Sequence, residues 1–146
     1  YINYEFSNFG KEGCFSKNNI AYWIGKSYLG IGPSAHSFNG TTRSWNISNN
    51  KKYIESITEN ELPLEKETLT ISDKYNEYIM TGLRTIWGIS MEKIELDFGK
   101  SFKDYALDIA KNYIEKNLLS FDNGKLVTTE KGKFLVDGIA SELFMI

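Results

Sequence analysis

Residues 72–146 combine helical periodicity with one tight turn, and few folds accommodate both. Apolar side chains recur there at three- and four-residue spacing, as on the buried face of an amphipathic helix. Such segments begin at Ser72, Ser90 and Ser101. The turn Asp122-Asn123-Gly124 follows, and it predicts a hairpin because Asn-Gly adopts positive φ at little cost. With a last helix expected from about Thr129, the order is that of a winged-helix-like domain.

Capping residues predict the limits of these helices. Ser72 is the expected N-cap of the first helix, and Gly88 its expected C-terminal end. Ser101-Phe102-Lys103-Asp104 has the capping-box form and is predicted to open the third helix. The side chains expected to face the core are Tyr75, Tyr78, Ile79, Leu83, Ile86, Trp87, Met91, Ile94, Phe98, Phe102, Tyr105, Ala106, Ile109, Tyr113, Leu118, Phe134, Leu135, Ile139 and Leu143.

Residues 1–50 differ from this pattern, because they hold ten of the 21 aromatic residues and show little helical periodicity. Tyr1 opens directly into a strand-like alternation, so we expect the chain to be a piece of a longer protein. A short helix is predicted over residues 51–58, and Pro63 then disfavours helix. The sequence therefore predicts an α+β chain with a first part over residues 1–58, a linker over 59–71 and a helical domain over 72–146.

The composition excludes several classes of protein. An apolar fraction of 41% and an aromatic fraction of 14% predict a globular protein with a buried core. No apolar run is long enough for a membrane span, and no signal peptide is recognisable. The single cysteine, Cys14, rules out an internal disulfide and favours a reducing compartment. We expect the cytoplasm.

Winged-helix domains often bind nucleic acid, but the charges of this domain do not favour such binding. Residues 90–146 hold eight lysines against ten acidic residues, and Asp122 and Lys125 cancel at the hairpin. Phosphate neutralisation supplies most non-specific affinity for nucleic acid, so no such partner is expected. Packing or docking onto a partner is the favoured role of this domain. A free-standing module that binds protein or nucleic acid is the alternative function.

An ordered set of motifs covers nearly the whole chain. These are Tyr4-Glu5-Phe6-Ser7-Asn8-Phe9-Gly10, Asn19-Ile20-Ala21-Tyr22-Trp23, the segment from Tyr28 to Phe38, Arg43-Ser44-Trp45-Asn46, and Leu83-Arg84 with Gly88-Ile89. The set resembles the HemW and HemN-like family, the oxygen-independent coproporphyrinogen III oxidase family. The Asn-x-x-Tyr-Trp and Gly-x-Gly-x-x-Ala-His-Ser patterns favour its HemW branch.

The resemblance implies a parent that is a radical S-adenosylmethionine protein. In the family, a partial (β/α) barrel carries Cys-x-x-x-Cys-x-x-Cys, which binds a [4Fe–4S] cluster that cleaves S-adenosylmethionine. This chain has one cysteine, so the resemblance implies only the closing segment of that barrel and the C-terminal domain, without catalytic activity. The implied partners are the upstream barrel, heme and a heme-accepting protein. A heme chaperone is favoured, and a porphyrinogen oxidase stays open.

Candidate cofactor contacts follow from the motifs and from residue chemistry. They are Asn19, Tyr22, Trp23, Gly30, Gly32 and His36. His36, the only histidine, could ligate heme iron or satisfy a hydrogen bond at a strand end. The family has histidine where this chain has Asn18, and an amide ligates iron poorly. The aromatic residues, among them Tyr28 and Trp45, could stack on a porphyrin or form core.

Three further features leave alternatives open. Glu5 is a carboxylate within an aromatic strand, suited to acid–base chemistry if buried, or to an ion pair with Arg43. Cys14 could be a heme thiolate or a small core residue. Gly30-Ile31-Gly32 shares two glycines with a dinucleotide fingerprint but lacks its other features, so a strand packed on cofactor or substrate is predicted instead. One histidine and one cysteine predict no catalytic set and no metal site.

Overall fold

The computed structural model describes residues 1–146, which divide into two compact units. Unit 1 comprises Tyr1–Ile24 and Ile71–Ile146, and unit 2 comprises Gly25–Thr70. Unit 2 is therefore a continuous insertion in the sequence of unit 1.

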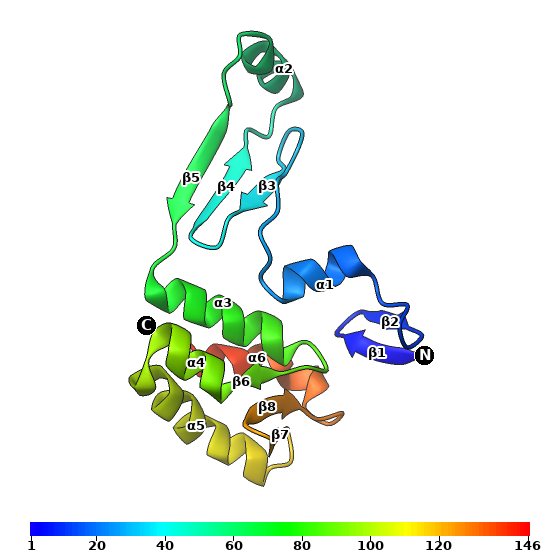
Figure 1. Ribbon diagram of the computed structural model, residues 1–146, viewed down its shortest axis with the longest axis vertical. Coiled ribbons are helices and arrows are strands. Elements are labelled where there is room, and N and C mark those ends of the chain that lie inside the picture. The colour runs from blue at the N-terminus through cyan, green and yellow to red at the C-terminus, as the bar shows by residue number, and fades with distance from the viewer. The chain divides into compact units, whose positions relative to one another are not determined.

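The C-terminal part of unit 1 has the winged-helix-like order of a helix, a short strand, two helices and a hairpin (Figure 1). Strands β6, β8 and β7 form an antiparallel sheet in that spatial order. The turn of the predicted hairpin has positive φ at Asn123 and Gly124, as expected for an Asn-Gly turn. The elements are α3 (Ile71–Leu83), β6 (Ile89–Ser90), α4 (Met91–Phe98), α5 (Lys100–Glu115), β7 (Leu119–Asp122), β8 (Lys125–Thr128), the 3-10 helix η1 (Lys133–Leu135) and α6 (Val136–Glu142).

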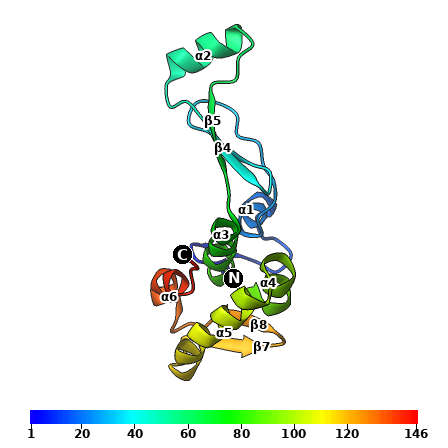
Figure 2. The same cartoon turned by 90° about the vertical axis from the view of Figure 1, so that its left-hand side faces the viewer.

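One hydrophobic core holds these elements together. Helix α3 contributes Tyr75, Ile79 and Leu83, all fully buried at the four-residue spacing that the sequence predicts. Helix α4 lies beside α5 (Figure 1), and α5 lies beside β7 (Figure 2). Ala106 and Ala110 of α5 are fully buried in this core. The other buried members are Ile89, Met91, Ile94, Leu118, Leu119, Leu126, Val136, Ile139, Ala140 and Leu143.

The N-terminal part of unit 1 is a hairpin followed by a short helix. Strands β1 (Ile2–Glu5) and β2 (Asn8–Gly10) pair antiparallel, and α1 spans Lys17–Trp23. Tyr4 is buried, and its ring stacks on that of Phe15 with centroids 4.5 Å apart. The Ile86 N–H donates to the Tyr4 carbonyl at 3.1 Å. The first strand is thereby fixed to the loop that follows α3.

Unit 2 is a three-stranded antiparallel meander with one helix. Its strands β3 (His36–Phe38), β4 (Thr42–Asn46) and β5 (Leu64–Thr68) lie in that order, and α2 (Asn50–Thr58) joins β4 to β5. The predicted helix is present, but β5 lies within residues 59–71, for which no strand was expected. The unit buries Leu69 and leaves most of its other apolar side chains at least partly exposed.

The α+β class is confirmed, and all three sheets are open rather than closed into a barrel. None of the helices has both the length and the apolar character needed to cross a membrane.

Several predicted helix limits are wrong. Helix α3 begins at Ile71, so Ser72 lies inside the helix and is not its N-cap. Helix α3 ends at Leu83, before Gly88, because Thr128 of β8 donates its hydroxyl to the Leu83 carbonyl at 2.7 Å. Ile86 and Trp87 therefore lie in a loop, with Ile86 exposed. Helix α5 begins at Lys100 with Gly99 as its N-cap, so Ser101 lies inside the helix and makes no cap.

The last helix also begins later than predicted. The hydroxyl of Thr129 donates to the carbonyls of Asn117 and Leu118, which ties the segment after β8 to the end of α5. A 3-10 turn follows, and α6 starts only at Val136. Phe134 is consequently 92% exposed instead of lying in the core, and Leu135 is exposed as well.

Tyr75 and Tyr78 differ in how their hydroxyl groups are satisfied. The Tyr75 hydroxyl is buried and has no hydrogen-bond partner, whereas the Tyr78 hydroxyl accepts from the Ser90 N–H at 2.9 Å. Burial, with a smaller contribution from Tyr105, raises the pKa of the Tyr75 phenol well above its ordinary value. The buried phenol therefore stays neutral in the folded protein.

We expect Tyr75→Phe to raise the free energy of unfolding by about 1 kcal/mol, because an unpaired buried hydroxyl is removed. Tyr78→Phe, the matched control, should lower it by about 1 kcal/mol because Ser90 loses its acceptor. A raised folded-state pKa leaves stability constant below the unfolded-state value near 10 and lowers it above that pH. Urea unfolding at neutral pH measures the effects of the two substitutions. Urea unfolding of the wild-type chain at alkaline pH measures the loss of stability there. The account is contradicted if both variants are destabilised equally.

Candidate functional site

The six predicted cofactor contacts fall into two sets, one in each unit. Three lie on α1 in unit 1, and three lie in unit 2, in the loop before β3 and at the start of that strand. The α1 set is Asn19, Tyr22 and Trp23; the set in unit 2 is Gly30, Gly32 and His36.

Helix α1 presents its set on a surface that is only partly covered. Ser16 caps the helix by accepting from the Asn19 N–H at 3.3 Å. Tyr22 is 49% exposed, and Trp23 is half-buried. The indole N–H of Trp23 is buried and has no hydrogen-bond partner. Asn18, which replaces the histidine of the family motif, is exposed on the same helix.

In unit 2 the two glycines of the Gly-x-Gly segment serve local packing. A Cβ at position 30 would lie 2.1 Å from the His36 carbonyl oxygen, so only glycine lets this loop approach β3. Gly32 has a φ of +102°, its N–H donates to the Tyr53 hydroxyl, and its carbonyl accepts from the Asn46 side chain at 2.8 Å. The predicted strand here reduces to one bridge, between Tyr28 and Phe38.

His36 is exposed at the start of β3 and faces a tryptophan. It pairs in register with Trp45 of β4, and their ring centroids are 6.2 Å apart. The Trp45 indole N–H donates to Glu65 of β5 at 3.1 Å, which holds the ring in place. This arrangement presents an accessible imidazole beside an aromatic surface.

The chain's own residues do not fit a metal cluster. Cys14 is exposed, so it is not a core residue, and no group of three His, Cys, Asp or Glu side chains is placed to hold a metal ion. A [4Fe–4S] cluster needs several cysteine thiolates, and one cysteine cannot supply them.

Glu5 is buried and is satisfied by its own turn. It is 2% exposed, and its carboxylate accepts from the backbone N–H and hydroxyl of Ser7 at 3.3 and 3.2 Å. The side-chain amide of Asn8 is a further donor. The Tyr-Glu-x-Ser-Asn motif thus carries its own hydrogen-bond partners for the buried side chain of Glu5, which could not be read from the sequence. Arg43 belongs to unit 2, and its pairing with Glu5 stays a prediction.

Arg84 is the residue of this region that the sequence analysis overlooked. Its guanidinium forms a two-pronged ion pair with Asp137 of α6 at 2.7–2.9 Å. It also lies over the rings of Phe6 and Trp23, 5.5 and 6.0 Å from their centroids. The Leu83-Arg84 pair within a family motif was the available signal.

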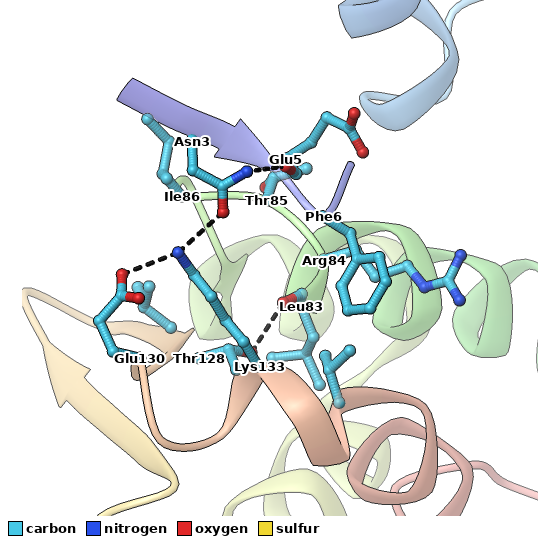
Figure 3. A pocket seen from close by; sticks show the side chains of 12 residues that line it. Asn3, Glu5, Phe6, Leu83, Arg84, Thr85, Ile86, Thr128, Glu130 and Lys133 are labelled. Atoms are coloured by element: carbon cyan, nitrogen blue, oxygen red, sulfur yellow. Dashed lines mark hydrogen bonds and ion pairs between the residues drawn. The ribbon is translucent and has the colours of Figure 1, made fainter. Parts of the chain in front are cut away.

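A cavity of about 100 Å³ lies beside Arg84, between β1, the loop after α3, β8 and η1 (Figure 3). The ammonium group of Lys133 extends into it and donates to Asn3 at 2.9 Å and to Glu130 at 2.7 Å. Drug-sized ligands occupy pockets of about 300–1,000 Å³. This cavity is therefore too small to hold a porphyrin.

Known proteins match this chain in sequence and in fold. Residues 69–135 match the model of the HemN C-terminal domain. The chain is 33% identical over 133 residues to heme chaperone HemW of Bacillus subtilis, across 90% of this chain and 35% of that protein. The chain belongs to the HemW and HemN-like family. The predicted resemblance is thereby confirmed.

Other members of the HemW and HemN-like family extend the comparison. Heme chaperone HemW of Lactococcus lactis is 32% identical over 148 residues, across 95% of this chain and 39% of that protein. The solved structure of coproporphyrinogen III oxidase (HemN) from Escherichia coli, described as a radical SAM enzyme, superposes with a TM-score of 0.66 at 21% identity. It covers 89% of this chain and 34% of the other, and it shows the shared fold. The chain spans little more than a third of the curated relatives it matches.

Proposed function

We propose that this chain is part of a cytoplasmic heme chaperone and that it is catalytically inactive by itself. The observation that carries the proposal is its similarity, over nine-tenths of its length, to proteins named as heme chaperone HemW. Only about a third of each of those proteins is matched. In this proposal, the radical S-adenosylmethionine barrel and its [4Fe–4S] cluster belong to the part of the parent protein that this chain does not cover. The proposed partners are that barrel, heme and a protein that accepts the heme.

Heme is the cargo in this proposal, and the chain's contribution is to hold it. His36 is the proposed axial ligand, because its imidazole is accessible and imidazole binds heme iron well. Trp45 lies beside it and offers an aromatic face for the porphyrin ring. On α1 the exposed Tyr22 and the neighbouring Asn19 and Trp23 form the second proposed contact surface. The cluster, when bound to the barrel of the parent protein, would supply one-electron chemistry.

Titration with hemin, followed by the Soret band, tests the proposal. We expect the wild-type chain to shift the band, and His36→Ala to weaken binding by about ten-fold or more because the axial ligand is lost. Cys14→Ala is the control for thiolate ligation and should leave the shift intact, because His36 and not Cys14 is the proposed axial ligand.

A second substitution makes the test sharper. Asn18 is exposed on the first turn of α1, so Asn18→His should fold normally and restore a ligand at the family position. We expect it to recover hemin binding in the His36→Ala background. A wild-type chain that leaves the Soret band unchanged, with far-UV circular dichroism that shows it is folded, contradicts heme binding by this chain.

A further inference from the structure

Helix α1 carries three of the proposed porphyrin contacts, but few contacts with the rest of unit 1 hold the helix in place. It has seven residues, none of them fully buried. The indole N–H of Trp23 makes no hydrogen bond, so only packing can orient this ring. Another part of unit 1 must therefore fix the direction in which α1 presents Asn19 and Tyr22.

The guanidinium of Arg84 is the group placed to do this. Arg84 follows directly after α3, whose core residues are fully buried, so the backbone of Arg84 is firmly positioned. The Cζ atom of Arg84 lies over the rings of Trp23 and Phe6, 6.0 and 5.5 Å from their centroids. The interaction between a cation and the face of an aromatic ring is attractive, and a planar guanidinium can also stack on such a ring.

Asp137 fixes the orientation of that guanidinium. Both of its carboxylate oxygens accept from Arg84, one of them from two nitrogens. A two-pronged pair of this kind sets the plane of the guanidinium as well as its position. Residues from the β1–β2 turn, α1 and α6 therefore meet on one side chain.

We propose that Arg84, held by Asp137, is a positioning residue that orients Trp23 and thereby the porphyrin-contacting face of α1. The part of this inference that concerns porphyrin rests on the proposed function. The part that concerns Trp23 rests on the contacts of unit 1 alone. Arg84 itself does not touch the cargo.

Fluorescence of Trp23 tests the positioning directly. In a Trp45→Phe, Trp87→Phe background of the whole chain, Trp23 is the only tryptophan. We expect Arg84→Met to raise acrylamide quenching of Trp23 about two-fold, because the ring loses the cation packed on it. Arg84→Lys should give an intermediate value, since an ammonium group keeps the charge but cannot form the planar fork.

Hemin titration of the same variants, with their own tryptophans retained, tests the consequence for cargo. Arg84→Met should weaken binding roughly five-fold while leaving the axial ligand in place. Lys100→Met is the matched control, because it removes an exposed ion pair with Asp104 in the same unit. It should change neither quenching nor hemin affinity.

Three outcomes decide the inference. Increased quenching with weakened hemin binding supports both parts. Increased quenching with unchanged hemin binding supports the positioning of Trp23 and overturns the role of α1 in binding cargo. Unchanged quenching in Arg84→Met overturns the positioning itself, whether or not the chain binds hemin, so this failure differs from a failure of the proposed function.

Discussion

Alanine at position 88 should lower the free energy of unfolding by at least about 3 kcal/mol. Gly88 has a φ of +63°, which costs any residue with a side chain. A Cβ there would lie 2.1 Å from the Leu126 carbonyl oxygen and 2.8 Å from a Val127 methyl group. Strand β8 cannot retreat, because Leu126 pairs with Ile89 and is itself fully buried.

Urea unfolding followed by circular dichroism measures this loss, and Gly124→Ala is its control. Gly124 has a φ of +74° and nothing within 4 Å of where its Cβ would lie. Alanine there should cost only the backbone contribution, about 1 kcal/mol. The difference between the two variants isolates the collision with β8. If Gly88→Ala cost no more than Gly124→Ala, the close approach of the loop to β8 would be refuted.

The helices and the hairpin of unit 1 could be predicted because each has a local cause. Apolar spacing predicts α3, α4 and α5, and the Asn-Gly pair predicts the turn between β7 and β8. Their limits depend on distant partners and could not be predicted. At the end of α3, for example, the Leu83 carbonyl accepts a hydrogen bond from the hydroxyl of Thr128, which is 45 residues away in sequence.

Strand β5 and the exposure of Phe134 in η1 could not be predicted, for a different reason. Residues 64–68 read Leu-Glu-Lys-Glu-Thr, which lacks the apolar alternation of a half-buried strand because four of the five side chains are exposed. Phe134 follows the apolar spacing of α6, yet the 3-10 turn places it outside the helix and in solvent. Hydrophobic pattern identifies a buried face only where the chain is already known to be helical.

Several residues of the motifs that identified the family have a role in the fold. Glu5 is satisfied within its own turn, and Gly30 is required by its approach to His36. The contact between Arg84 and Trp23 could not be foreseen, because the two residues are 61 positions apart and the whole of unit 2 lies between them in the sequence. Exposed motif residues such as His36 and Tyr22 are the ones proposed to bind the cargo.

Helix α4 offers a direct measure of how strongly the core of unit 1 depends on a single side chain. Ile94 is fully buried among the core residues, whereas Leu96, two residues further along the same helix, is 83% exposed. Both are aliphatic, and their helix propensities differ only slightly. Truncation to alanine therefore removes a similar volume from the buried core at position 94 and from the solvent-exposed surface at position 96.

We expect Ile94→Ala to lower the free energy of unfolding by about 2–5 kcal/mol, because burial is lost and a cavity remains. Leu96→Ala should stay within about 0.5 kcal/mol of the wild type, since little apolar surface returns to water. Chemical denaturation with a common slope for all three proteins measures both values. If Leu96→Ala were instead as costly as Ile94→Ala, the exposed face of α4 would have to be covered in solution, and the search for partners would begin on that face.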